Sequence, residues 1–138
     1  VNSILSVYAR QAKEKQIDVN IDAGVPADIP IRDIDWVAIL ANMFENAIHG
    51  CVNSGKMQQE IDIYIAKRGS KIVIQCTNTC ADDIRFQKGI PKSRSGEGIG
   101  TASIMKTASR YNGGTDFAME DGRFVTRILL NLSGINEL

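Results

Sequence analysis

The sequence contains little cysteine and proline, few aromatic residues, and no excess of charge of either sign. Its three cysteines, Cys51, Cys76 and Cys80, form an odd set without a C-x-x-C pair, which argues against a disulfide framework and a zinc site. We therefore expect them to be small apolar side chains of the core. The 16 basic and 16 acidic residues give zero formal net charge, which removes the electrostatic argument for binding nucleic acid or an anionic membrane.

Long apolar runs are also lacking. No run approaches the roughly 20 residues of a membrane-spanning helix, and the first residues lack the basic and then apolar pattern of a secretory signal. We therefore expect a cytoplasmic location and no membrane contact by this chain. Its 138 residues suffice for one domain that buries a conventional core without a metal or disulfide staple.

Three helices are expected from the spacing of apolar residues. The first covers residues 1–16 and is typical of the tail of a longer helix. The second begins at Asp33 or Asp35, either of which could cap or charge its first turn, and ends at His49, with Gly50 as a stop signal. The third covers residues 101–111, buries Ile104, Ala108 and Tyr111, and ends at Asn112-Gly113-Gly114.

Strands are expected where apolar and polar residues alternate. Residues 17–21 fit a half-buried strand, and residues 61–76 fit a hairpin with its turn at residues 68–70. A closing hairpin turns at Asp121-Gly122 into a last strand over residues 124–132. Residues 79–98 lose the apolar period, which is typical of a functional lid. This order favours a two-layer α/β sandwich, with a mixed, mainly antiparallel sheet and helices on one face, over a doubly wound parallel fold.

The second helix carries two opposite stripes. We expect an apolar core stripe at Val37, Leu40, Phe44, Ile48 and Cys51, and a polar stripe at Asn42, Glu45, Asn46 and His49. A solvated face is the ordinary interpretation of such a polar stripe. Two asparagines in mid-helix are poor helix formers, however, and an amide oxygen is a hard ligand that suits magnesium beside substrate phosphates. We therefore interpret the polar stripe as a binding surface.

The run SGEGIGTASI places Gly96, Gly98 and Gly100 just before Thr101, the expected start of the third helix. Backbone N–H groups there, together with the positive end of the helix dipole, can converge on an anion. The run is not a P-loop, because no Gly-Lys-Ser/Thr follows at Walker spacing, and it does not follow a strand as a dinucleotide fingerprint should. On its own, a flexible loop would explain these glycines equally well.

Taken in order, these pieces resemble the ATP-binding domain of the GHKL superfamily, whose fold is of the Bergerat type. NMFENAIHG resembles the N box of sensor histidine kinases, GEGIG resembles their second glycine box, and Phe86 resembles the phenylalanine that precedes the lid. The closest likeness is to peptide-sensing, quorum-type kinases. It covers nearly the whole chain: residues 1–16 resemble the end of a dimerisation helix, and residues 17–138 resemble the ATP-binding catalytic domain.

The resemblance implies ATP and Mg²⁺ as cofactors and a role for each matching residue. Asn46 would coordinate Mg²⁺, and Asn42 would contact phosphate or a metal-bound water, which makes the two the expected catalytic residues. His49 would touch phosphate, unless it is only a structural histidine at a helix end. The other expected nucleotide contacts are the phosphate-binding residues Gly96, Gly98, Ile99, Gly100 and Thr101 and the lid residues Lys92, Ser93 and Arg94.

Two positions depart from patterns within the superfamily. The first glycine box, Asp-x-Gly-x-Gly, corresponds here to residues 78–82, where both glycines are missing and Asn78 replaces the aspartate. An asparagine oxygen can still accept from the adenine amine, without the strength of a charge-assisted bond. Hydrolytic members carry a glutamate base where Asn42 stands, and an amide cannot act as a base. Glu45 points about 100° away from Asn46 along the helix, so it is a poor substitute.

The resemblance therefore implies phosphoryl transfer rather than hydrolysis. The chain would be the catalytic fragment of a protein histidine kinase, inactive alone because the phosphoacceptor histidine lies on a domain absent from it. The implied partners are that domain, a response regulator, and a second copy of the full-length protein, which would be a homodimer and could be a membrane-bound sensor. Two alternatives stay open: an anti-sigma-factor-like serine kinase, and a degenerate GHKL interaction module without nucleotide turnover.

Overall fold

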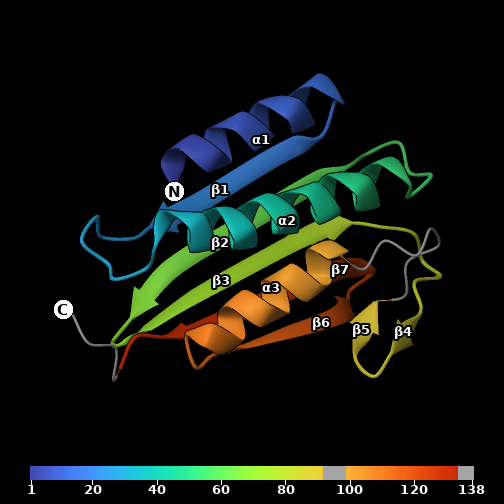
Figure 1. Cartoon of the computed structure of the whole chain (residues 1–138). Helices are drawn as coiled ribbons and strands as arrows, with labels where there is room; N and C mark the ends of the chain where they lie inside the picture. The colour runs from blue at the N-terminus through green and yellow to red at the C-terminus, as the bar shows by residue number, and fades with distance from the viewer. Residues whose placement is uncertain (92–98, 134–138) are drawn as a thin grey trace.

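The computed structural model describes residues 1–91 and 99–133, and this part of the chain forms three helices and seven strands. Their order is α1 (Asn2–Glu14), β1 (Asp18–Gly24), α2 (Asp33–Val52), β2 (Glu60–Arg68), β3 (Lys71–Thr79), β4 (Phe86–Gln87), β5 (Ile90–Pro91), α3 (Ile99–Arg110), β6 (Gly114–Glu120) and β7 (Arg123–Asn131). Figure 1 shows α2 and α3 side by side and running in opposite directions.

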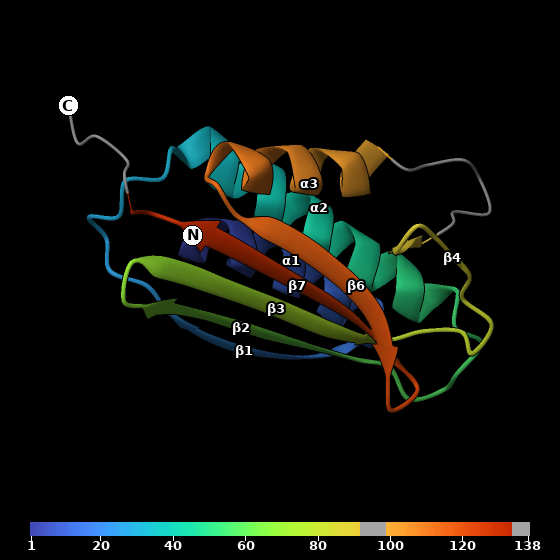
Figure 2. The ribbon, with the colours of Figure 1, turned by 90° about the horizontal axis from the view of Figure 1, so that it is seen from below.

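Five strands form one sheet in the order β1-β2-β3-β7-β6. β1 is parallel to β2, and the other neighbouring strands are antiparallel. The helices pack against one face of the sheet, and no helix of the described residues covers the other face (Figures 1 and 2). The predicted two-layer α/β sandwich with a mixed, mainly antiparallel sheet is confirmed.

Alternation along the strands decides which face is buried. In β2, Ile61, Ile63 and Ile65 lie under the helices, whereas Asp62 and Tyr64 point to the uncovered face. The helix that covers the centre of the sheet is α2, whose buried side chains are Asp35, Trp36, Ile39, Leu40, Met43, Phe44, Ala47, Ile48 and Cys51. This continuous apolar stripe is what holds the polar face of α2 at a fixed height above the sheet.

The three cysteines behave as the sequence predicts. Cys51 and Cys76 belong to the main core, Cys80 belongs to a smaller cluster with Phe117 and Phe124, and all three are buried and free. Burial raises the pKa of Cys51 to about 11, so its thiol stays protonated and unreactive at neutral pH.

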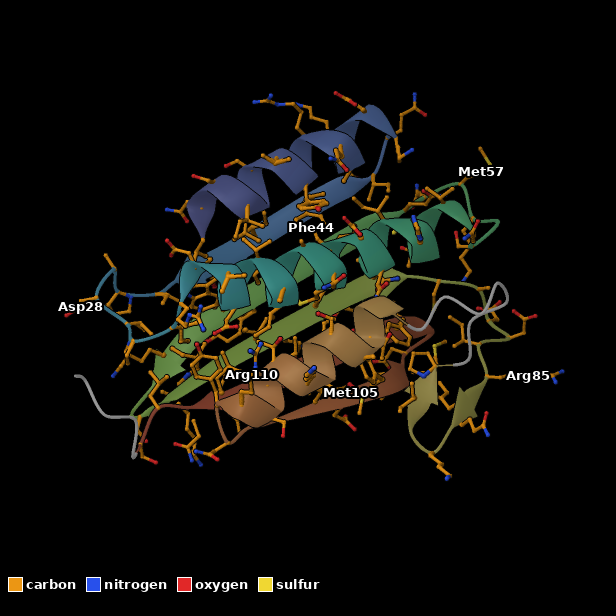
Figure 3. The ribbon with its side chains drawn as sticks, in the orientation of Figure 1. Asp28, Phe44, Met57, Arg85, Met105 and Arg110 are labelled. Carbon is orange, nitrogen blue, oxygen red and sulfur yellow. The ribbon has the colours of Figure 1, made fainter. Side chains whose placement is uncertain are left out.

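The first helix joins the same core as the rest of the chain. Leu5 and Ala12 of α1 are buried there, and the ring of Tyr8 stacks on Phe44 of α2 with the ring centroids 5.7 Å apart. Figure 3 shows Phe44 between the two helices. The assignment of residues 1–16 to the end of a dimerisation-type helix stays a prediction. None of the helices in the described part of the chain has the length and apolar character needed to cross a bilayer.

The predicted start of α2 at Asp33, with acidic residues in its first turn, is confirmed, whereas the predictions were wrong for its end and for one core position. The helix continues past Gly50 to Val52, and its N-cap is Arg32, so neither Asp33 nor Asp35 caps it, although both lie in its first turn. Val37 is 46% exposed rather than part of the core. Gly50 does not stop the helix, because the apolar stripe continues to Cys51, which is fully buried.

The segment predicted as a lid contains a short hairpin that the sequence analysis missed. β4 and β5 pair through a two-residue turn, and both turn residues, Lys88 and Gly89, have positive φ, as such turns require. The helix that follows begins at Ile99, two residues before the predicted start at Thr101. The predicted burial of Ile104, Ala108 and Tyr111 is confirmed.

Gly113 sets how closely the end of α3 approaches the sheet. A Cβ at this position would lie 1.6 Å from the carbonyl oxygen of Leu129, a backbone atom that cannot move aside, whereas a Cβ at Gly114 would meet nothing within 4 Å. We predict that Gly113→Ala lowers the free energy of unfolding by about 2–4 kcal/mol. Gly114→Ala is the matched control and should change it by less than about 0.5 kcal/mol in urea denaturation. Equal effects of the two substitutions would contradict this account.

Candidate nucleotide site

Two carboxamides one helical turn apart form the centre of the candidate site. Asn42 is half-buried on α2, and its Nδ2 donates to the carbonyl oxygen of Ala38 at 2.6 Å. Because a carbonyl only accepts, the nitrogen must face Ala38, and the amide oxygen must face away from it. Asn46 lies one turn further along the same side of the helix and is exposed.

The start of α3 lies directly against these two amide oxygens. A Cβ at Gly100 would be 3.3 Å from Oδ1 of Asn42 and 3.4 Å from Oδ1 of Asn46. A side chain at this position would therefore press on both oxygens, and a glycine leaves the space between the helices open. The predicted convergence of the two asparagines with the glycine run is confirmed at Gly100, the part of that run for which the structure describes these contacts.

The first turn of α3 supplies hydrogen-bond donors at the same place. The first N–H groups of a helix have no partner within it, and among the described residues these belong to residues 99–101. The positive end of the helix dipole adds to their attraction for an anion. Thr101 is 9% exposed, so its role at this point is its backbone N–H rather than an open side chain. A polyanion held here would meet N–H groups on one side and amide oxygens on the other.

Asn78 lies at the end of β3 under the last turns of α2. Only 3% of it is exposed, and its Nδ2 donates to the carbonyl oxygen of Thr79 at 2.8 Å. Oδ1 can accept a hydrogen bond from an amino group, and Nδ2 carries a second N–H besides the one directed at Thr79. Gly50 makes the arrangement possible, because a Cβ there would come within 2.5 Å of Nδ2 of Asn78.

A second contact between α2 and α3 lies at the opposite end of both helices. Asp35, 4% exposed, accepts hydrogen bonds from the Tyr111 hydroxyl and, at 3.0 Å, from Nη2 of Arg110. Burial, and then the hydrogen bond to Asp35, raise the pKa of the Tyr111 phenol. Figure 3 shows Arg110 at the end of α3, beside the first turns of α2. This group holds the two helices together away from the site, so Asp35 is a residue of the α2–α3 interface.

Glu45 is directed toward α1. The hydroxyl of Tyr8 donates to Oε1 of Glu45 at 2.6 Å. The expectation that Glu45 does not replace the missing base agrees with this geometry, because its carboxylate is engaged on the α1 side of α2. His49 is exposed in the last turns of α2.

The remaining predicted residues are only partly covered by the structure. Lys92, Ser93, Arg94, Gly96 and Gly98 lie outside the described residues, so their predicted contacts stay predictions. Ile99 is described only as the first residue of α3.

Three residues that shape the site were missed as such by the sequence analysis. Gly50 was interpreted as a helix stop, although the apolar stripe that continues to Cys51 was a signal against it. Tyr8 contacts Glu45, which lies 37 positions further along the chain, and Asp35 contacts Tyr111, 76 positions further along. No local sequence pattern predicts contacts over such separations.

The uncovered face of the sheet holds a shallow hollow of about 430 Å³. Polar side chains from β1, β2 and β3 line it, among them Asn20, Asp22, Asp62, Gln75 and Thr77. It lies on the side of the sheet opposite Asn42 and Asn46 and is wide open, so we do not assign the nucleotide to it. No group of three or more His, Cys, Asp or Glu side chains suited to a metal occurs in the described part of the chain.

Comparisons with known proteins agree with the fold described above. The sequence model described as the GHKL domain matches residues 31–131. No curated protein sequence matches the chain significantly. A nucleotide-free structure of the catalytic domain of the histidine kinase ThkA is similar, with a TM-score of 0.76, 12% identity, and coverage of 95% of this chain and 90% of that one. The mycobacterial sensor histidine kinase MprB has a TM-score of 0.70, 12% identity, and coverage of 94% and 91%.

A longer protein has the same fold within it. The blue-light activated histidine kinase of Erythrobacter litoralis matches with a TM-score of 0.71 and 15% identity, and the match covers 99% of this chain and 42% of that one. At these identities the likeness shows the fold.

The hydrogen bond from Asn78 to Thr79 predicts the effect of restoring an aspartate. In Asn78→Asp a carboxylate oxygen would face the Thr79 carbonyl at the 2.8 Å now occupied by a donor, which should lower the free energy of unfolding at pH 7 by about 1–3 kcal/mol. Burial would raise the pKa of the introduced carboxyl in the folded state. The loss of stability in Asn78→Asp is then complete above that pKa. It shrinks as the pH falls through the pKa, because the protonated carboxyl can donate to the Thr79 carbonyl.

Denaturation of both proteins across the acidic range measures this difference. Asn2→Asp, at the exposed start of α1, is the control and should change the stability by less than about 0.5 kcal/mol. A variant as stable as the wild type at pH 7 would show that Asn78 is not held in this orientation.

Proposed function

The chain belongs to the GHKL domain family, and we propose that it is the ATP-binding catalytic domain of a sensor histidine kinase. The observation that carries the proposal is the approach of Gly100 to the amide oxygens of Asn42 and Asn46. Two neutral oxygens and the N-terminal N–H groups of a helix suit a metal-chelated triphosphate better than any apolar ligand. The fold likeness to histidine kinase catalytic domains supports the same function.

The residues present fit Mg²⁺ and ATP in their donor chemistry. Asn46 would hold Mg²⁺ through its amide oxygen, and Asn42 would contact phosphate or a metal-bound water. The backbone N–H groups of Gly100 and Thr101, with those of Gly96, Gly98 and Ile99, would hold the phosphates. Asn78 would accept from the adenine amino group through Oδ1, while Nδ2 donates to Thr79.

The reaction proposed is transfer of the γ-phosphoryl group to a protein imidazole. A ring nitrogen of a histidine outside this chain attacks the γ-phosphorus, the bond from that phosphorus to the β,γ-bridging oxygen breaks, and ADP leaves with the bond's electrons. Bound Mg²⁺ would neutralise the charge of the phosphates. The protein contributes positioning and charge neutralisation, for which His49, Lys92, Ser93 and Arg94 are the proposed cationic and polar contacts.

Hydrolysis is not favoured by these residues. Position 42 holds an amide, which cannot take a proton from water, and Glu45 is bonded to Tyr8 on the far side of α2. The chain would thus bind ATP without hydrolysing it until the phosphoacceptor histidine is present.

The proposal also covers the type, the partners and the location of the full-length protein. We infer a kinase of the quorum-sensing, peptide-receptor type, because the motifs of the sequence resemble that group of kinases. The proposed partners are the phosphoacceptor domain of the same protein, a response regulator, and a second copy in a homodimer, and the proposed location is the cytoplasm.

Calorimetry with a non-hydrolysable ATP analogue, with and without Mg²⁺, tests the site. The wild type should bind in a magnesium-dependent manner, and Asn46→Ala should weaken binding by about 10- to 100-fold, as expected for loss of a contact to a charged group. The matched control is Asn20→Ala, which removes an exposed asparagine that donates to Asp62 on the other face of the sheet, and it should leave the affinity unchanged.

Other outcomes separate the alternatives. Absence of binding by the wild type in both conditions would contradict the proposal and favour an interaction module. If binding occurs, a dimerisation domain from the parent protein can be supplied with ATP. Acid-labile phosphate on that domain would show histidine transfer, and acid-stable phosphate would favour a serine kinase.

A further inference from the structure

We propose that Tyr8 of α1 is a positioning residue for the nucleotide site, because it holds the carboxylate of Glu45 away from the face of α2 that carries Asn42 and Asn46. This inference rests on the proposed function, since it concerns charge beside a bound triphosphate. It assigns to α1 a role in nucleotide binding although α1 contributes none of the proposed nucleotide contacts.

Glu45 occupies a position from which its carboxylate can lie on either side of α2. It directly precedes Asn46, follows Asn42 by three residues, and precedes His49 by four. Residues three and four apart are neighbours on a helix surface, so Asn42 and His49 are both within reach of the Glu45 side chain. Between Asp35 and the end of α2, Glu45 is the one acidic residue in the sequence.

The structure shows which side the carboxylate takes. Oε1 of Glu45 accepts the hydroxyl hydrogen of Tyr8 at 2.6 Å, on the side of α2 that faces α1. The Tyr8 ring is fixed in turn by stacking on Phe44, with 5.7 Å between centroids and 25° between planes. Phe44 is fully buried, so the hydroxyl is presented from an anchored ring rather than from a mobile side chain.

The donor keeps its proton under physiological conditions. The hydrogen bond to Glu45, followed by partial burial, raises the pKa of Tyr8 to about 12. The phenol therefore remains a hydrogen-bond donor throughout the neutral range. Tyr8 does not lose its proton in this range, so the hydrogen bond to Glu45 is kept.

The consequence for the site is electrostatic. A carboxylate that turned toward Asn42 and His49 would stand beside the phosphates and repel them, and it would compete for His49 as a partner. The effect should be larger for ATP than for ADP, because ATP carries more negative charge. Since the donor stands on α1 and the acceptor on α2, the position of α1 against α2 becomes a determinant of the charge at the site.

A double-mutant cycle tests the proposal on the chain of residues 1–138. The four proteins are the wild type, Tyr8→Phe, which keeps the ring on Phe44, Glu45→Gln, which keeps the size of the side chain, and the double variant. Their affinities for the magnesium complexes of ADP and of a non-hydrolysable ATP analogue are measured by calorimetry. Tyr64→Phe is the matched control, because it removes a tyrosine hydroxyl that accepts from Arg68 on the opposite face of the sheet.

We expect Tyr8→Phe to weaken binding of the ATP analogue by about three- to tenfold, a size typical of one unit charge several ångströms away in a partly solvated site. The loss should be smaller for ADP, should shrink as salt is added, and should vanish in the double variant. Tyr64→Phe should bind as the wild type does. Equal weakening of binding in Tyr8→Phe and in the double variant would show that Tyr8 acts through packing alone. An unchanged affinity in Tyr8→Phe would show that Tyr8 has no role in binding. Either result overturns the proposal.

A second measurement needs no nucleotide and separates this proposal from the proposed function. In the nucleotide-free protein, the side-chain amide resonances of Asn42 and the ring resonances of His49 should shift in Tyr8→Phe and return toward their wild-type positions in the double variant. Shifts that persist in the double variant, or their absence from Tyr8→Phe, would overturn the proposal. Failure of the wild type to bind nucleotide would instead refute the proposed function, while these resonances would still report whether Tyr8 directs Glu45.

Discussion

The contact on which the site depends is the approach of the first turn of α3 to the polar face of α2. A Cβ at Gly100 would lie 3.3 and 3.4 Å from the two amide oxygens, so the helices meet here more closely than a residue with a side chain easily allows. The rest of the fold maintains this approach. The apolar stripe of α2 fixes its height on the sheet, the group of Asp35, Arg110 and Tyr111 ties the other ends of the two helices, and Gly113 lets the end of α3 turn closely into β6.

α2 is therefore the element that assembles the site. Its first turn holds α3 through Asp35, its middle presents the two asparagines, and its last turn passes over Asn78 at Gly50. Its other side receives α1 through Phe44 and Glu45. Under the proposed function, this one helix would connect the metal, phosphate and base contacts, so a displacement of either neighbouring helix would alter what the polar face of α2 presents.

The sequence predicted those features that repeat with a short period or follow from one residue type. Alternation located β2 and β3, the 3.6-residue period located α2, and the mid-helix asparagines indicated the face of α2 that the start of α3 approaches. Interactions across long separations could not be predicted in this way: Asp35 was expected only to cap or charge the first turn of α2, whereas its carboxylate also accepts the hydrogen bond from Tyr111, 76 residues away. Gly50 was misinterpreted for the same reason, because the need for a glycine comes from Asn78 on another strand rather than from the helix itself. The predicted contacts of the lid residues remain untested.

The most direct test of the central claim replaces Mg²⁺ with Mn²⁺ and follows paramagnetic broadening by NMR. In the presence of ATP, the account predicts the strongest broadening at the side-chain amides of Asn42 and Asn46 and at the backbone N–H of Gly100, and little broadening there from Mn²⁺ alone. Strongest broadening at Asp22 and Asp62 on the uncovered face of the sheet, with or without nucleotide, would contradict a metal-chelated triphosphate held between α2 and α3.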